Sequence, residues 1–154
     1  MQHKHPIRPI YGLKKGGKMK SKRIKEVTIY DDRLGIVTID VSSLGTTQYI
    51  MLLIALEYDV GKSCSEISDY TGVGIDQVYK SLDILKRHHH VKKLKLRDIP
   101  DELRDYFSTY MGNNRVRGYY FPTKKGITYI RYILKKNNLH ILLKKIPDED
   151  ALIV

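Results

Sequence analysis

Cysteine, long apolar runs and enzyme motifs are scarce in this 154-residue chain. The single cysteine, Cys64, cannot form a disulfide within the chain, so we expect a reducing compartment and a Cys64 side chain that packs as a small buried residue. The longest apolar run, Tyr49 to Leu56, is far shorter than the roughly 20 residues that span a bilayer. The first apolar run also comes too late for a secretory signal. We therefore expect a soluble cytoplasmic protein.

Motifs of common catalytic and metal sites are missing as well. The chain has no complete nucleotide-binding glycine loop, no HExxH and no CxxC pair, and His140 and Cys64 have no evident catalytic companions. His3 and His5 lack a nearby cysteine or carboxylate, and the consecutive histidines 88–90 point in different directions, whereas a tetrahedral metal site needs convergent ligands. We expect no enzyme activity, no cofactor and no metal, and we interpret residues 88–90 as a turn.

Positive charge is in excess. Lysines and arginines number 28 against 17 acidic residues, which gives a net charge of +11 and an isoelectric point of about 9.6. Such an excess indicates a polyanionic partner; the alternative is that the lysines only keep the protein in solution.

The first 25 residues concentrate this charge, with nine lysines or arginines and no acid. Prolines and glycines interrupt the segment and disfavour regular structure. We interpret it as a flexible basic arm that lies along phosphates or enters a minor groove. The alternative is a disordered tail that adds only solubility.

A β-hairpin is predicted after the arm, from Glu26 to Val41, because apolar residues alternate on both sides of the turn sequence DDRLG. Its role is to cover the core or to pair with a partner chain. The side chains predicted to face one another are Val27 and Ile29 on one strand and Val37, Ile39 and Val41 on the other.

A helix capped by Ser42 or Ser43 and running to about Asp59 is predicted next. Its segment Tyr49 to Leu56 is apolar on every side, so we expect a central helix that is covered all round, either by the core alone or with one face at a dimer interface. Residues 60–63 are expected to add a short strand.

The stretch from Ser63 to Arg87 predicts two short helices joined by a tight turn. Ser63 or Ser65 is expected to cap the first helix, and Gly72 and Gly74 supply the turn, with Val73 in the corner between the helices. The second helix has apolar residues three and four positions apart, which indicates one buried face. That buried stripe is Ile75, Val78, Leu82 and Leu85.

These two helices resemble the helix-turn-helix of winged-helix DNA-binding regulators, and the resemblance extends to Gly126. After the recognition helix the family has a two-stranded wing, matched here by VKKLKLR (residues 91–97) and RVRGYYF (residues 115–121), and then a signature matched by residues 123–126. His89 stands where glycine is usual, and Pro122 replaces a leucine. The resemblance implies an α+β winged helix-turn-helix, here with an N-terminal β-hairpin and a C-terminal helix capped by Thr123.

The expected organisation is a basic arm at 1–25, a winged-helix domain at 26–138 and a C-terminal extension at 139–154 that contributes to a dimer. An acidic insertion at 98–114 interrupts the wing and is predicted to form a short amphipathic helix that points away from nucleic acid. The acidic residues 148–150 are expected to be frayed or to dock on a neighbour.

The resemblance and the charge together predict sequence-specific binding of double-stranded DNA and transcription regulation by a homodimer. Gln77 is expected to contact adenine, and Lys80 guanine or phosphate. The alternative is a winged-helix scaffold for proteins or RNA. The composition, rich in Ile, Lys and Tyr and free of Trp, resembles that of small proteins from thermophilic archaea and their viruses. The predicted contact residues are Ile75, Asp76, Gln77, Tyr79, Lys80, Lys86 and Arg87 on the recognition helix, Lys93, Lys95, Arg97, Arg115 and Arg117 on the wing, and Lys14, Lys15, Lys18, Lys20, Lys22 and Arg23 on the arm.

Overall fold

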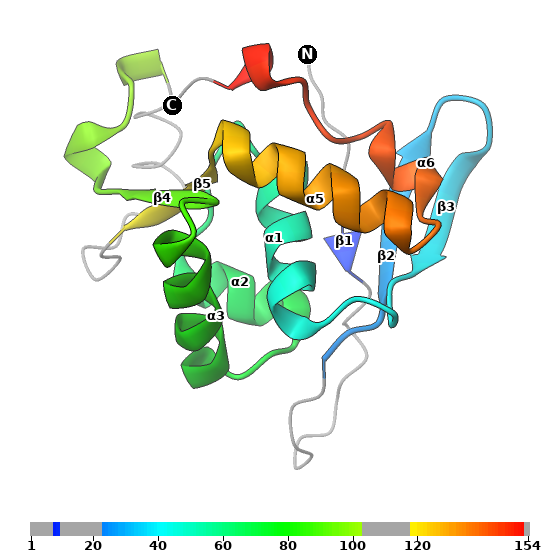
Figure 1. Ribbon diagram of the computed structural model, residues 1–154, viewed down its shortest axis with the longest axis horizontal. Helices are drawn as coiled ribbons and strands as arrows, with labels where there is room; N and C mark the ends of the chain where they lie inside the picture. Colours follow the sequence, from blue (N-terminus) through cyan, green and yellow to red (C-terminus); the bar gives the residue numbers. More distant parts are fainter. Residues whose placement is uncertain (1–7, 10–22, 103–117, 153–154) are drawn as a thin grey trace.

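A computed structural model describes residues 8–9, 23–102 and 118–152 of the chain. The described part is α+β: one antiparallel sheet at the N-terminal side, a group of helices, and a second, two-stranded sheet (Figure 1). In chain order its elements are β1 (Arg8–Pro9), β2 (Glu26–Asp31), β3 (Gly35–Asp40), α1 (Thr46–Leu56), α2 (Cys64–Thr71), α3 (Ile75–Arg87), β4 (Val91–Leu94), the 3-10 helix η1 (Leu96–Asp98), β5 (Tyr119–Pro122), α5 (Lys124–Lys136), α6 (His140–Leu143) and the 3-10 helix η2 (Glu149–Ala151).

The predicted hairpin is confirmed as β2 and β3. Val27 pairs with Ile39 and Ile29 with Val37, so the alternating apolar side chains share the face that packs on the core. The sequence did not indicate β1, a two-residue strand inside the segment expected to be unstructured. Its Pro9 is tolerated because a strand at the edge of a sheet need not donate a hydrogen bond on its outer side.

Helix α1 is shorter than predicted at both ends. Ser42 does not cap it, because its amide and hydroxyl both donate to the carboxylate of Asp40 (2.8 and 2.6 Å), which holds Ser42 in the turn after β3. The helix begins after Gly45, whose amide donates to the side-chain oxygen of Gln48 (3.0 Å). It ends at Leu56, and Glu57 instead pairs with Lys62 at 2.6 Å.

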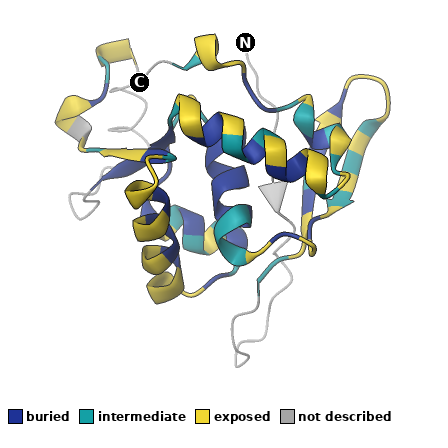
Figure 2. Cartoon of the chain, in the orientation of Figure 1, coloured by how far each residue is buried: buried dark blue, intermediate teal, exposed yellow. Residues whose placement is uncertain are grey.

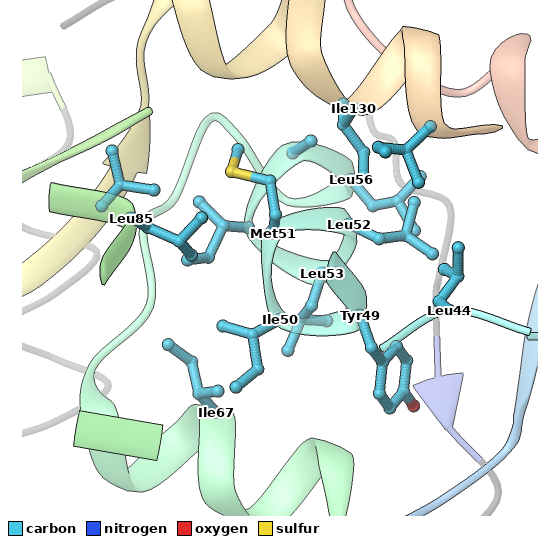
Figure 3. Packing of buried hydrophobic residues seen from close by; sticks show 14 of the residues in the cluster. Leu44, Tyr49, Ile50, Met51, Leu52, Leu53, Leu56, Ile67, Leu85 and Ile130 are labelled. Atoms are coloured by element: carbon cyan, nitrogen blue, oxygen red, sulfur yellow. The ribbon is translucent and has the colours of Figure 1, made fainter. Parts of the chain in front are cut away.

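The core is built around α1. All residues from Tyr49 to Leu56 are buried, with at most 4% of any of them exposed. Figure 3 shows Ile67 of α2, Leu85 of α3 and Ile130 of α5 gathered around them. The prediction of a helix covered on every side is confirmed, and this chain alone provides the cover, so no face of this segment is left for a dimer. No helix in the described residues is long and apolar enough to cross a membrane.

The second sheet pairs β4 with β5 in an antiparallel register that sets Val91 opposite Pro122. The first predicted wing strand is wrong at its end: β4 stops at Leu94, and the chain then turns, because the amide of Asp98 donates to the carbonyl of Lys95 (2.8 Å). This turn lets Ile99 pack with Tyr119 and Phe121 in a small separate cluster. The predicted helix of the 98–114 insertion falls mostly outside the described residues.

Residues 60–63 reach the second sheet at one point. Lys62 forms a bridge with Tyr120 through two backbone hydrogen bonds (3.1 and 2.8 Å), so the expected short strand is a single bridge.

The C-terminal residues cover this chain's own helices. Leu142 and Ile146 are buried in the main core. The carboxylate of Asp148 lies 3.5 Å from the guanidinium of Arg131 on α5, and Glu149 accepts a hydrogen bond from Thr128 (3.1 Å). The expectation that residues 148–150 are frayed is therefore corrected, because two of them bind α5.

Candidate nucleic-acid interface

The predicted tight turn between α2 and α3 is present. Gly72 adopts left-handed backbone angles (φ +75°, ψ +8°), which glycine reaches without the steric cost of a side chain. Val73 is buried in the corner, and the hydroxyl of Ser68 donates to its carbonyl (2.7 Å). Gly74 has ordinary negative φ, so only the first of the two glycines is required by the backbone. The two helices are thus held in a fixed relation.

Helix α2 starts with a reciprocal cap that involves Ser63 and not Ser65. The Ser63 hydroxyl accepts from the amide of Glu66 (3.2 Å), and the Glu66 carboxylate accepts from the amide of Ser63 (3.0 Å). The cap fixes where α2 begins, with Cys64 as its first residue, buried as predicted.

Helix α3 buries one side and exposes the other over its whole length, as Figure 2 shows in its yellow outer face. Val78, Leu82 and Leu85 are buried as predicted, together with Ser81. Ile75 was also predicted in the buried stripe, and this is wrong: as the first residue of the helix it is 41% exposed. The exposed residues are Ile75, Asp76, Gln77, Tyr79, Lys80, Asp83, Ile84, Lys86 and Arg87.

The middle of this exposed face carries balanced charge. Asp76, Lys80, Asp83 and Arg87 follow one another at spacings of four, three and four, which places them in one row along the helix. The Arg87 guanidinium lies 2.7 Å from the Asp83 carboxylate, and this hydrogen bond and charge lower the pKa of Asp83. A phosphate chain would meet no net attraction along this row.

The second sheet lies beside the Tyr79 side of α3. Burial raises the pKa of the Cys64 thiol, and the nearby side chains of Tyr79 and Lys93 partly offset this rise. Burial also raises the pKa of Tyr120 to about 12, with smaller contributions from Cys64, Tyr79 and Asp83. The ammonium of Lys93 lies 6.0 Å from the centre of the Tyr120 ring. The exposed helix face and the sheet therefore form a continuous surface.

Exposed cations lie on β4, which contacts α3, and on the residues that follow it. Lys93, Lys95 and Arg97 are exposed, although only Lys93 lies within a strand. Lys92, which the sequence analysis did not select, is exposed too. The other predicted contacts lie outside the described residues: Arg115 and Arg117 of the wing and Lys14, Lys15, Lys18, Lys20 and Lys22 of the arm.

Arg23 is the one predicted arm contact within the described residues, and its role is structural. Its guanidinium donates to the carbonyls of Leu44 (2.6 Å) and Val41 (2.9 Å) and lies 5.0 Å from the centre of the Tyr49 ring. Its assignment as a phosphate contact is therefore corrected, because the charge is already engaged by the core of this chain. The next residue, Ile24, donates its amide to the carbonyl of Thr71 (2.8 Å), so the arm joins the body beside the α2–α3 turn.

The histidines 88–90 form the predicted turn between α3 and β4. His89 takes a left-handed φ of +62°, the conformation for which glycine is usual. Thr123 holds the turn from the other side, since its hydroxyl donates to the carbonyl of His89 (2.6 Å) and its amide to that of His90 (3.1 Å). The His90 ring stacks on Tyr129 with centres 4.4 Å apart. Burial lowers the pKa of His90, and positive charge at His88, Lys125 and His89 lowers it further.

The start of α5 is close to this turn and brings two cations that the sequence analysis did not select. The Thr123 hydroxyl accepts from the amide of Gly126 (3.0 Å), which confirms the predicted cap. Gly126 leaves no room for a Cβ beside the His90 carbonyl oxygen. Lys124 and Lys125, both exposed, therefore extend the cationic border of α3 and β4. Both lysines lie within residues 123–126, which match the winged-helix signature, and that match could have drawn attention to them.

No group of three or more His, Cys, Asp or Glu side chains in the described ranges could hold a metal ion. Comparisons of the chain with models of protein families, with curated proteins and with solved structures found no match. Function is therefore inferred from the surface and fold of this chain alone.

Proposed function

We propose that this protein is a winged helix-turn-helix regulator that binds double-stranded DNA by sequence, acts in the cytoplasm and has no catalytic role. The observation that carries the proposal is the exposed face of α3, bounded on one side by the lysines of β4. In this proposal α3 enters the major groove, and the β4–β5 sheet lies over the adjacent phosphates.

The charge-balanced row of α3 supports base reading over simple attraction to phosphate. Gln77 can bond adenine and Lys80 guanine, and the carboxylates of Asp76 and Asp83 can accept from the amino group of cytosine. Carboxylates are repelled by phosphates, so a face of this kind gains from DNA only where the base edges match. The surrounding cations, Lys93 and Lys95 among them, add affinity without sequence information.

The arm completes the proposed contact. Ile24 is hydrogen-bonded to Thr71 beside the α2–α3 turn, and in this proposal the start of α3 at that turn enters the groove. We propose that the arm lysines lie along phosphates or in the neighbouring minor groove. We also propose that the protein acts as a homodimer, in which two copies of α3 read the two halves of a palindrome.

A scaffold for proteins or RNA is the second candidate, and apolar exposure on α3 favours it. Ile75, Tyr79 and Ile84 are 41%, 54% and 39% exposed on the same helix that carries Asp76 and Asp83. Exposed apolar groups of this kind are common at protein interfaces.

Selection of bound sequences from a random pool of duplexes tests the proposal. Enrichment of a palindromic motif is expected, with an affinity for that motif about 10³-fold or more above that for random duplex. A pool that shows no enrichment, together with tighter binding of structured RNA or of a protein partner at the same salt concentration, would favour the scaffold.

A further inference from the structure

A second cationic surface lies at the other end of the molecule from α3. We call it the α5–α6 patch and define it by Tyr132, Lys135 and Lys136 of α5, His140 of α6 and Lys144 just after α6. All five residues are exposed. Figure 1 shows α3 and α6 on opposite sides of the molecule, with α5 running between β5 and α6.

Two of the three lysines of the patch have no acidic partner among the described residues: Lys135 and Lys136 form no ion pair there. Lys144 forms one long ion pair, 3.9 Å from the carboxylate of the buried Asp31. Lys136 lies 5.8 Å from the centre of the Tyr132 ring, and that ring is 58% exposed. The patch thus combines three lysines with an open aromatic face.

Helix capping accounts for only part of this arrangement. Lys135 and Lys136 stand in the last turn of α5, where cations are stabilised by the helix dipole. Lys144 follows α6, which contacts α5, and an exposed tyrosine under a lysine contributes nothing to a cap of α5. Exposed lysines on two neighbouring elements are suited to a row of phosphates.

We propose that the α5–α6 patch binds the phosphate backbone of a second duplex segment without sequence preference, so that one chain bridges two duplexes. The inference rests on the proposed function for the first contact, made by α3. A straight duplex held by α3 at one end of the molecule leaves the patch at the opposite end free for the second.

A capture experiment with the full chain tests this. A duplex with the selected motif is fixed on beads, protein is added, and a labelled duplex without the motif is supplied in solution. The wild type is expected to retain the labelled duplex. The variant Lys135→Ala/Lys136→Ala/Lys144→Ala should retain at least tenfold less and bind the selected motif within about twofold of wild type, because its lost contacts are to phosphates of the second duplex.

The control variant Lys92→Ala/Lys93→Ala/Lys95→Ala removes the same charge near α3 and should weaken binding of the selected duplex instead. Capture that persists in the α5–α6 variant overturns the inference, since bridging would then come from an oligomer. A wild type that binds the motif but captures nothing also overturns it and leaves the proposed function standing. A third outcome is that selection yields no motif while the α5–α6 variant loses binding to random duplex. This outcome would support the patch as a phosphate site and refute the proposed reading role of α3.

Binding to vesicles of anionic phospholipid is measured as well, because a lipid surface also presents phosphates. If the α5–α6 variant loses vesicle binding while its capture of duplex is unchanged, the patch recognises a lipid surface and the inference is overturned.

Discussion

Single basic residues in this chain either bind within the fold or stay exposed, and only the exposed ones are available to the proposed partner. Arg23 binds two backbone carbonyls. Lys62 is buried beside Glu57 at 2.6 Å, with its ammonium 4.5 Å from the Tyr70 ring centre. Lys80 and Lys93, by contrast, are exposed. The sequence could not separate these cases, because Arg23 stands within a run of lysines and its carbonyl partners are about 20 residues away.

Replacing Asp83 by Asn tests whether the charge-balanced row faces DNA. The change removes one carboxylate and releases Arg87, which can then contact a phosphate. We expect affinity for a random duplex to rise about threefold or more, and its salt dependence to steepen by about 0.9 in log–log slope. Fluorescence anisotropy at several salt concentrations measures both. Asp32→Asn, in the exposed hairpin turn, is the matched control, and an equal rise in both variants would show that only net charge matters.

His90 makes stability depend on pH. Its pKa is lowered in the folded chain, mainly by burial, so at mildly acidic pH the unfolded chain binds a proton that the folded chain does not. The stability of the folded chain that depends on neutral His90 is therefore fully present above about pH 6.5 and is lost as the pH falls below that value.

In His90→Phe, which keeps a ring against Tyr129, the loss of stability between pH 7 and pH 5 should be smaller. Urea unfolding across that range measures it. His140→Gln, at an exposed histidine, should keep the wild-type slope. An unchanged slope in His90→Phe would contradict the account.

At the scale of elements, local signals predicted what local interactions determine. The sequence predicted the β2–β3 hairpin, the turn at Gly72 and the Thr123 cap, because each depends on residues that are neighbours in the chain. The failures have distant causes. The start of α1 moved because Asp40 binds Ser42, and β4 ended early where the chain turns to bury Ile99 against β5.

Substitutions at the start of α2 test whether the Ser63 cap stabilises the folded chain. Ser63→Ala removes the oxygen that accepts from the Glu66 amide, and we expect the free energy of unfolding to fall by about 1 kcal/mol. Ser65→Ala, at an exposed position two residues further along the chain, should change it by less than about 0.5 kcal/mol. Urea denaturation of the two variants compares them directly. Equal effects would mean that the cap contributes nothing.

At the scale of the whole molecule, the sequence indicated the α+β class, the hairpin and the candidate reading helix, but not how distant charges gather. The role of the C-terminal residues in a dimer stays a prediction, whereas the burial of Leu142 and Ile146 in this chain's own core was not foreseen. Lys124 and Lys125 are exposed at the start of α5, and Lys135, Lys136 and Lys144 are exposed at its other end and just after α6. Such groupings depend on tertiary packing, which places residues from separate elements side by side.

The ratio of affinities for selected and scrambled duplexes, measured for wild type, Gln77→Ala and Lys95→Ala, tests the reading role of α3 most directly. Gln77→Ala should lower the ratio by about 5- to 150-fold, because a good base contact contributes about 1 to 3 kcal/mol of discrimination. Lys95→Ala should weaken both duplexes alike and leave the ratio unchanged. A ratio that is the same in all three proteins would contradict the assignment of α3 as the helix that reads DNA.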